Sequence, residues 1–172
     1  SLNDYYRTGT AAVAGAALQS AVAPQGALES AFFALCAAAH YRFSGDKVIA
    51  AQTLPTAQKA LVNCGDFSVQ TASLALRAGA FVQLGAALDE LGEEGRAEFC
   101  RQQAEELRQG IAARWCDERG LVADEESGDQ ASQWANALVL YFALVPKDKL
   151  ERIGENIGAA DERMSDLWHV FF

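Results

Sequence analysis

Hydrophobic and polar positions along the chain form two kinds of helical stretch, and the two kinds alternate. Four stretches are apolar on every side, at residues 27–43, 67–91, 130–144 and 164–172. Three others carry a single apolar stripe at helical spacing, at residues 46–62, 94–114 and 147–157. A helix without a polar face has to be enclosed, whereas a helix with one apolar stripe covers its neighbours from outside. The alternation predicts an all-α fold of helical hairpins, each with one inner and one outer helix.

Residues between the first two stretches predict how the first hairpin turns. Gly45 is expected to end the inner helix in the left-handed conformation, and Asp46 to cap the next helix. Pro55 predicts a kink or a break within the outer helix, because proline has no N–H to donate. The outer helix is expected to bury Val48, Ile49, Leu54, Leu61 and Val62 and to expose Lys47, Gln52, Gln58 and Lys59.

Later boundaries follow the same logic. Asp129 is expected to cap the apolar helix 130–144, and Pro146 to open the outer helix after it. Residues 120–122 are expected to form a short extended piece, and an Ala/Gly-rich helix is expected at residues 10–22. Together these elements make one domain of helical hairpins.

Composition and charge restrict the classes of partner. The 172 residues are 51% hydrophobic and 22% charged, which is typical of one folded globular domain. A net charge of -9 argues against a nucleic-acid partner, because phosphate binding needs clustered Lys and Arg. No uninterrupted apolar run reaches the roughly 18 residues of a membrane span, so we expect no membrane partner.

Cysteine and histidine content argues against a metal site. Cys36, Cys64, Cys100 and Cys116 form no C-x-x-C pair, and the thiols favour a reducing compartment such as the cytoplasm. His40 and His169 are the only histidines, and each is expected to be a core residue, with a general-base role for His169 as the alternative. We therefore expect no metal and no cofactor.

Three segments, in their order and spacing, carry a resemblance. The first runs from Tyr41 to Asp46 and continues to Leu54-Pro55, matching a "Y-x-x-[ST]-G-D … P" hairpin. The second joins Leu91-Gly92 to the segment 115–121, which resembles "fwD-x-x-x-G". The third covers 132–138 and 144–146, which resembles "Q-x-x-A-L-A-L-x-x-G-L-V-P". The chain thus resembles the bacterial six-hairpin, (α/α)6-barrel glycosidases, and within them most closely the α-L-rhamnosidase family.

The resemblance implies a ring of helical hairpins and a carbohydrate substrate. A complete ring needs twelve helices, and the pattern here predicts fewer, so we expect a partial (α/α)6 toroid, either a fragment or a shortened relative. The family's general acid lies upstream of the Tyr41 hairpin, and no such segment is found in residues 1–27. Its water-activating Glu lies beyond an equivalent of Phe172. The chain alone is therefore expected to be incomplete or inactive as an enzyme.

Candidate site residues lie where the inner helices of such a ring begin. Those ends converge on one face, and their unpaired N–H groups suit hydroxyl-rich or anionic ligands. Glycoside hydrolysis needs two carboxylates, about 5–5.5 Å apart for retention or ~6.5–9.5 Å for inversion. Glu29 and Asp66 are the candidate catalytic pair, with capping as the alternative role of Asp66. The candidate substrate-binding residues are Tyr41, Asp129, Gln133, Trp134, Trp168 and His169.

Other readings of these residues stay open. A Trp in an apolar helix is also an ordinary core residue, and Asp129 is also a helix cap. The alternative function is a non-catalytic helical module that binds carbohydrate or protein, since an open ring leaves apolar flanks that favour a homodimer or docking to missing parts of the same protein. A different toroid enzyme, such as an unsaturated glucuronyl hydrolase or a sugar epimerase, is disfavoured because the chain is poor in His and Arg.

Overall fold

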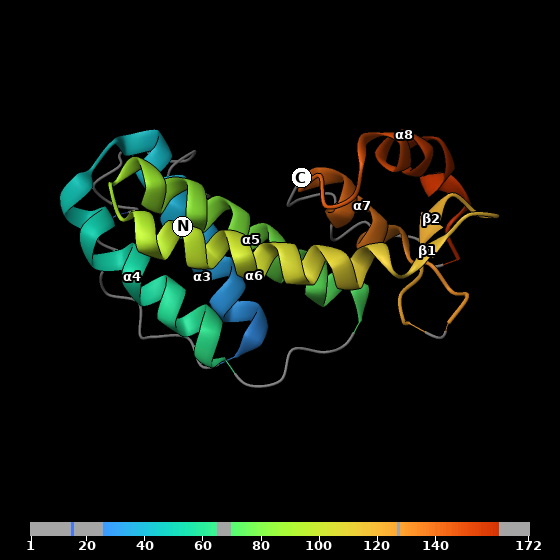
Figure 1. Ribbon diagram of the computed structural model, residues 1–172, viewed down its shortest axis with the longest axis horizontal. Coiled ribbons are helices and arrows are strands. Elements are labelled where there is room, and N and C mark those ends of the chain that lie inside the picture. Colours follow the sequence, from blue (N-terminus) through green and yellow to red (C-terminus); the bar gives the residue numbers. More distant parts are fainter. Residues whose placement is uncertain (1–14, 16–25, 65–69, 127, 162–172) are drawn as a thin grey trace. The chain divides into compact units, whose positions relative to one another are not determined.

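The computed structural model describes Gly15 and residues 26–64, 70–126 and 128–161 (Figure 1). These residues confirm an all-α fold with one short β-hairpin. The elements in chain order are α3 (Ala27–Ser44), α4 (Lys47–Asn63), α5 (Thr71–Glu90), α6 (Glu94–Ala112), β1 (Trp115–Cys116), β2 (Leu121–Val122), α7 (Gln133–Tyr141), α8 (Lys147–Asn156) and the short 3-10 helix η1 (Ile157–Ala159). The helices expected at 10–22 (Gly15 apart) and 164–172 lie outside the described residues.

Two compact units divide the chain. One comprises Ser1–Phe67 and Ala80–Ala104, and the other comprises Ser68–Gly79 and Glu105–Phe172. Helices α5 and α6 each contribute to both units. Buried apolar residues occur in both units, for example Leu54 in the first and Ile111 in the second.

The turn between α3 and α4 follows its sequence signals. Gly45 has a φ of 66°, the left-handed region that favours glycine, and its N–H donates to the Tyr41 carbonyl. The Asp46 carboxylate accepts hydrogen bonds from the backbone N–H groups of Val48 and Ile49, each at 3.0 Å. Both cap predictions are therefore confirmed.

Helix α4 is continuous through Pro55, so the expected break is wrong, while the alternative expectation of a kink stays a prediction. The proline leaves the carbonyl of Ala51, four residues earlier, without its usual N–H donor. The hydroxyls of Thr53 and Thr56 donate to the carbonyls of Ile49 and Gln52, on either side of that carbonyl. Helix α4 also packs along α3, and this tertiary packing offsets the cost of the proline.

The buried face of α4 also differs from the expected one. Leu54 and Leu61 are buried as expected, but Val48 and Val62 are exposed and Gln58 is buried. Gln58 Nε2 donates to the Arg96 carbonyl at 3.3 Å, and Arg96 donates back to Gln58 Oε1 at 3.2 Å. A paired amide can be buried at small cost, which explains why a polar residue takes an inward position.

Helix α3 buries its small side chains rather than its large ones. The buried face consists of Ser30, Ala31, Ala34, Ala37, Ala38, His40 and Tyr41. Leu28, Phe32 and Phe43 are exposed, so the expectation that this helix is enclosed on every side is wrong. Alanine faces let neighbouring backbones approach closely, and the large side chains then point outward. Burial of His40 lowers its pKa, which keeps the imidazole neutral at neutral pH.

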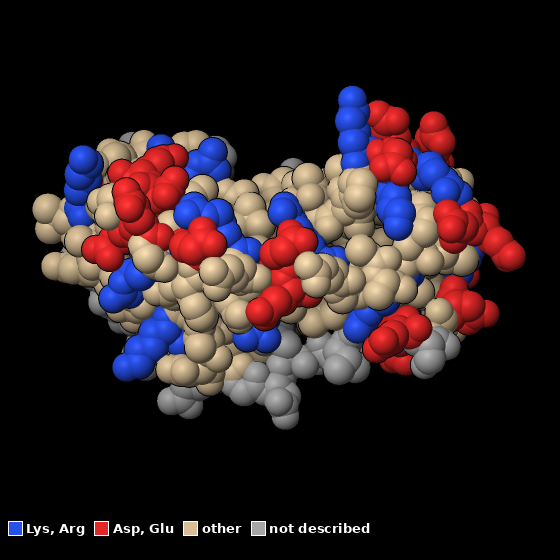
Figure 2. Space-filling model, viewed as in Figure 1, with Lys and Arg blue, Asp and Glu red and all other residues tan. Residues whose placement is uncertain are grey.

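Helix α6 has the apolar stripe that the sequence predicts. Cys100, Ala104 and Ile111 are buried and Leu107 is half-buried. Burial raises the pKa of the Cys100 thiol to about 11, so it behaves as a small hydrophobic group. Figure 2 shows that acidic and basic side chains are interspersed on the face in view rather than gathered into a patch of one sign.

The β-hairpin confirms the extended piece expected at 120–122 for Leu121 and Val122, whereas Gly120 lies in the turn. Strands β1 and β2 are antiparallel, with Trp115 opposite Val122, and the turn uses Gly120 at a φ of 64°. Helix α8 lies against the hairpin. Lys149 Nζ and Arg152 Cζ lie over the Trp115 ring, 4.9 and 5.2 Å from its centroid, in cation–π contact. Hydrogen bonds from Trp115 and Arg152 hold the pKa of Asp117 below its usual value.

Helix α5 is the one described helix that is long and apolar enough to cross a membrane, judged by length and composition alone. Its most apolar window is 61% buried against the rest of the protein, as in the core helix of a globular fold. Length and composition therefore do not separate these two roles.

Gly79 in α5 lies directly against the ring of Phe142, which follows α7. A Cβ atom at this position would be 2.4 Å from two carbon atoms of that ring. Phe142 is buried, so the ring has little room to move. Only glycine allows α5 and the end of α7 to pack this closely.

We expect Gly79→Ala to lower the free energy of unfolding by about 1–3 kcal/mol, the usual cost of overpacking. Gly110→Ala is the matched control, because a Cβ atom added to Gly110 in α6 would have no other atom within 4 Å. That change should raise stability by about 0.5–1 kcal/mol through helix propensity. Urea unfolding followed by circular dichroism measures both, and equal effects at the two glycines would contradict the close contact.

Candidate functional site

The candidate site is built around Asp124, which joins the starts of α5 and α7. The backbone N–H of Thr71, the first residue of α5, donates to the Asp124 carbonyl at 2.8 Å. The hydroxyl of Ser132, just before α7, donates to Asp124 Oδ1 at 2.7 Å. Two helices that are far apart along the chain therefore begin beside the same half-buried aspartate. Since both N-termini carry partial positive charge, a carboxylate is favoured there.

Further bonds fix the position of Thr71 at this junction. Its hydroxyl donates to the Ala123 carbonyl at 2.6 Å. Arg114 Nη1 donates to the Thr71 hydroxyl at 2.9 Å and to the Asp124 carbonyl at 3.2 Å. The charged guanidinium thus satisfies two acceptors at once, one on each side of the junction.

Helix α7 begins later than the sequence predicts. Asp129 does not cap it; Ser132 is the N-cap, and its hydroxyl accepts a hydrogen bond from the Ala135 N–H at 3.2 Å. Helix α7 cannot begin at Asp129 because residues 129–131 form hydrogen bonds with other segments. The Gln130 carbonyl accepts from the Asp124 N–H, and the Asp129 carbonyl accepts from Arg119.

Asn136, on the next turn of α7, holds the β-hairpin against the helix. Its side chain is fully buried and accepts from the Val122 N–H at 2.8 Å. It also donates to the carbonyls of Val122 and Ser132, each at 3.0 Å. The amide thereby pairs both backbone groups of Val122 in the hairpin's second strand.

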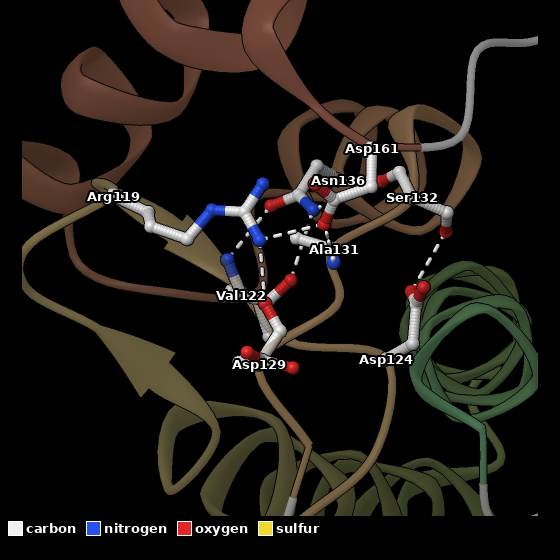
Figure 3. A network of polar contacts seen from close by, with 8 residues as sticks. All are labelled: Arg119, Val122, Asp124, Asp129, Ala131, Ser132, Asn136 and Asp161. Carbon is white, nitrogen blue, oxygen red and sulfur yellow. Dashed lines mark hydrogen bonds and ion pairs between the residues drawn. The ribbon is translucent and has the colours of Figure 1, made fainter.

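Asp161 closes the other side of the network (Figure 3). Asp161 Oδ2 accepts from Arg119 Nη1 at 2.6 Å and from the Ala131 N–H at 2.9 Å, and the Asp161 N–H donates to the Ala131 carbonyl. The Arg119 bond, followed by the Ala131 bond, holds the pKa of Asp161 below its usual value. The segment after η1, the loop before α7 and the hairpin turn are thus tied together.

Three of the sequence-predicted substrate-binding residues lie in this region. Asp129 is exposed in the loop before α7, while Gln133 and Trp134 are half-buried in the first turn of α7. They are neighbours of the Asp124–Ser132 junction along the chain.

Glu29 and Tyr41 belong to the other unit, on α3. Glu29 is exposed, and its Oε2 accepts a hydrogen bond from the Gly26 N–H at 3.1 Å, which caps the start of α3. Tyr41 is buried in the alanine face of the same helix. The remaining predicted residues, Asp66, Trp168 and His169, lie outside the described residues.

Asp124, Arg114 and Thr71 were missed by reasoning from sequence. Thr71 begins α5, Arg114 lies between α6 and β1, and Asp124 lies two residues after β2. Polar side chains at the ends of helices and strands are ordinarily expected to face solvent. No spacing of residues in the sequence indicates these contacts, because the partners come from segments far apart in the chain. Across the parts of the chain that the structure describes, no group of three or more His, Cys, Asp or Glu residues is arranged to hold a metal.

Comparisons with known proteins leave the family open: no protein-family model, curated protein or solved structure matches this chain.

We expect Asn136→Ala to lower the free energy of unfolding by about 2–4 kcal/mol, because it leaves the Val122 N–H and carbonyl buried without a partner. Asn63→Ala is the control, since Asn63 is exposed at the last residue of α4 and its loss should change stability by about 0.5 kcal/mol or less. Chemical denaturation gives both values. Similar small losses at the two positions would mean that Asn136 does not hold the hairpin.

Proposed function

We propose that this chain is the helical domain of a glycoside hydrolase, similar to the bacterial α-L-rhamnosidases, with its hairpins arranged as part of an (α/α)6 toroid. The observation that supports the proposal best is the junction at Asp124. A ring of helical hairpins requires its inner helices to begin on one side, and α5 and α7, both predicted as inner helices, begin beside this residue.

The substrate class proposed is a carbohydrate. A sugar ring offers an apolar face and many hydroxyl groups, and the first turn of α7 offers Trp134 for stacking and Gln133 for hydrogen bonding. Asp129, exposed in the preceding loop, supplies a carboxylate that accepts hydrogen bonds from hydroxyl groups. These three residues form the proposed sugar-contacting surface.

The chemistry proposed for this class is acid–base hydrolysis. One carboxylic acid protonates the glycosidic oxygen as its bond to the anomeric carbon breaks, and one carboxylate takes a proton from the water whose oxygen bonds to that carbon. Glu29 and Asp66 remain the proposed pair. Glu29 in its described position also has a structural role as the cap of α3, so a test has to separate the two roles.

Glu29→Gln separates catalysis from capping. Glutamine retains an oxygen that accepts from the Gly26 N–H, since Glu and Gln serve equally at this capping position, but it has no acidic proton. Where the wild-type protein cleaves any of a panel of aryl glycosides led by an aryl α-L-rhamnoside, we expect the Gln variant to lose about 10²–10⁴-fold of that hydrolysis rate, with unchanged thermal stability. Glu29→Ala should lose both the activity and the cap.

Full activity in Glu29→Gln would restrict Glu29 to capping. Wild-type protein that cleaves no glycoside would agree with the expectation that this chain alone is inactive, and the support for hydrolysis by this chain would then be lost. The second candidate function, a carbohydrate-binding module without catalysis, is favoured by the exposed position of Glu29 and its existing bond in the cap. Calorimetric binding of an oligosaccharide without cleavage, weakened by Gln133→Ala and unchanged in Glu29→Gln, would support that function instead.

A further inference from the structure

His40 lies on the buried face of α3, where its ring meets Gly15. His40 is 4% exposed, and Gly15 is also buried. A Cβ atom added to Gly15 would be 3.3 Å from His40 Nε2 and 3.4 Å from His40 Cε1, and it would overlap the end of the Ile49 side chain on α4. The backbone of Gly15 therefore covers the Nε2–Cε1 edge of the imidazole. A side chain at this position would have to displace His40 or Ile49.

We propose that His40 is a pH-sensitive switch for this contact: the neutral imidazole allows Gly15 to pack against α3 and α4, and the imidazolium releases it. The packing holds the ring away from water, and burial costs a charged ring far more free energy than a neutral one. Movement of Gly15 away from the ring exposes the Nε2–Cε1 edge to water. Protonation therefore favours the state in which Gly15 is displaced.

The charged groups that act on the ring do not cancel the cost of burial. Asp46, the half-buried N-cap of α4, attracts a proton to His40, and the α-amino group of this chain opposes it. The Asp46 carboxylate already accepts hydrogen bonds from two N–H groups of α4. Arg42 and Lys47, the other charged residues close in sequence, are exposed. Burial is the largest effect, so the pKa of His40 lies below its ordinary value of 6.5.

The direction of the pH effect follows from the difference between the packed and the displaced state. Once Gly15 is displaced, the exposed ring should have the ordinary pKa of about 6.5. The displaced state therefore binds more protons than the packed state at pH values between the pKa of the packed ring and that ordinary value. The packed state is fully favoured above this interval, becomes less stable as the pH falls through it, and changes no further below it.

The switch is reciprocal, because proton binding and the packing of Gly15 are linked through one equilibrium. Lower pH displaces Gly15, and a substitution that displaces Gly15 raises the pKa of His40. This second consequence distinguishes a switch at the Gly15 contact from burial of His40 by the rest of the fold.

Nuclear magnetic resonance titration of the His40 ring tests this link. The Cε1 proton, assigned by its loss in His40→Gln, should titrate below the ordinary pKa of 6.5 in the wild-type chain. Gly15→Leu should move the titration up toward that value, and Gly15→Ala, which adds only a Cβ atom, part of the way. Gly110→Leu is the matched control and should leave the titration unchanged, because a Cβ atom added to this helical glycine in α6 would have no other atom within 4 Å.

Amide exchange measures the release of Gly15 itself. Gly15 is helical and buried, so its N–H should be protected when it is packed. Relative to the intrinsic exchange rate at each pH, we expect this protection to fall roughly threefold or more between about pH 7.5 and about pH 5, since a pKa difference of one corresponds to a factor of ten. In His40→Gln, whose side chain is uncharged throughout this range, the protection should not change with pH.

Three results would overturn the proposal. The first is a wild-type His40 that titrates at or above its ordinary pKa. The second is the same titration in the wild-type chain and in Gly15→Leu, with circular dichroism showing that both are folded; if the Leu variant is unfolded, the comparison with Gly15→Ala decides. The third is protection of the Gly15 N–H that does not depend on pH in the wild-type chain. None of these measurements uses a sugar, so the outcome is independent of the proposed hydrolysis.

Discussion

The fold of the second unit depends on one set of hydrogen bonds, those by which Asp124 receives the first N–H of α5 and the Ser132 hydroxyl before α7. Helix starts carry N–H groups without partners inside the helix, so each needs an acceptor from elsewhere. The Asp124 carbonyl accepts the first N–H of α5 directly. At α7 the Asp124 carboxylate accepts the Ser132 hydroxyl, and the oxygen of that hydroxyl accepts the Ala135 N–H. Arg114, Asn136 and Asp161 then tie the hairpin, the loop and the segment after η1 to the same place.

Small residues determine how closely the helices pack around these bonds. Gly79 leaves room for Phe142 in the second unit, and the alanines of α3 form the buried face of that helix in the first. When small side chains occupy the contact, the large apolar ones have to lie elsewhere. In α3 they lie outward, which is why Leu28, Phe32 and Phe43 are exposed.

Local signals in the sequence predicted the helices well, and long-range contacts explain the rest. Gly45 and Asp46 act through their own backbone conformation and nearest neighbours, so the α3–α4 turn was predictable. Asp129 has the composition of a cap, but Ser132 takes that role because the loop before it bonds to Arg119 and Asp124. The spacing of apolar residues along the chain does not indicate hydrogen bonds between distant segments of this kind. The same limit applies to Gln58, whose partners lie in another helix.

Amide hydrogen exchange at Thr71 tests the central claim most directly. Thr71 is the first residue of α5, a position whose N–H has no partner within the helix and ordinarily exchanges quickly. If it donates to the Asp124 carbonyl, nuclear magnetic resonance should show its exchange slowed on the order of 10³-fold or more relative to an unprotected amide. Exchange at the unprotected rate, in protein whose α5 interior is protected, would contradict the junction between α5 and α7.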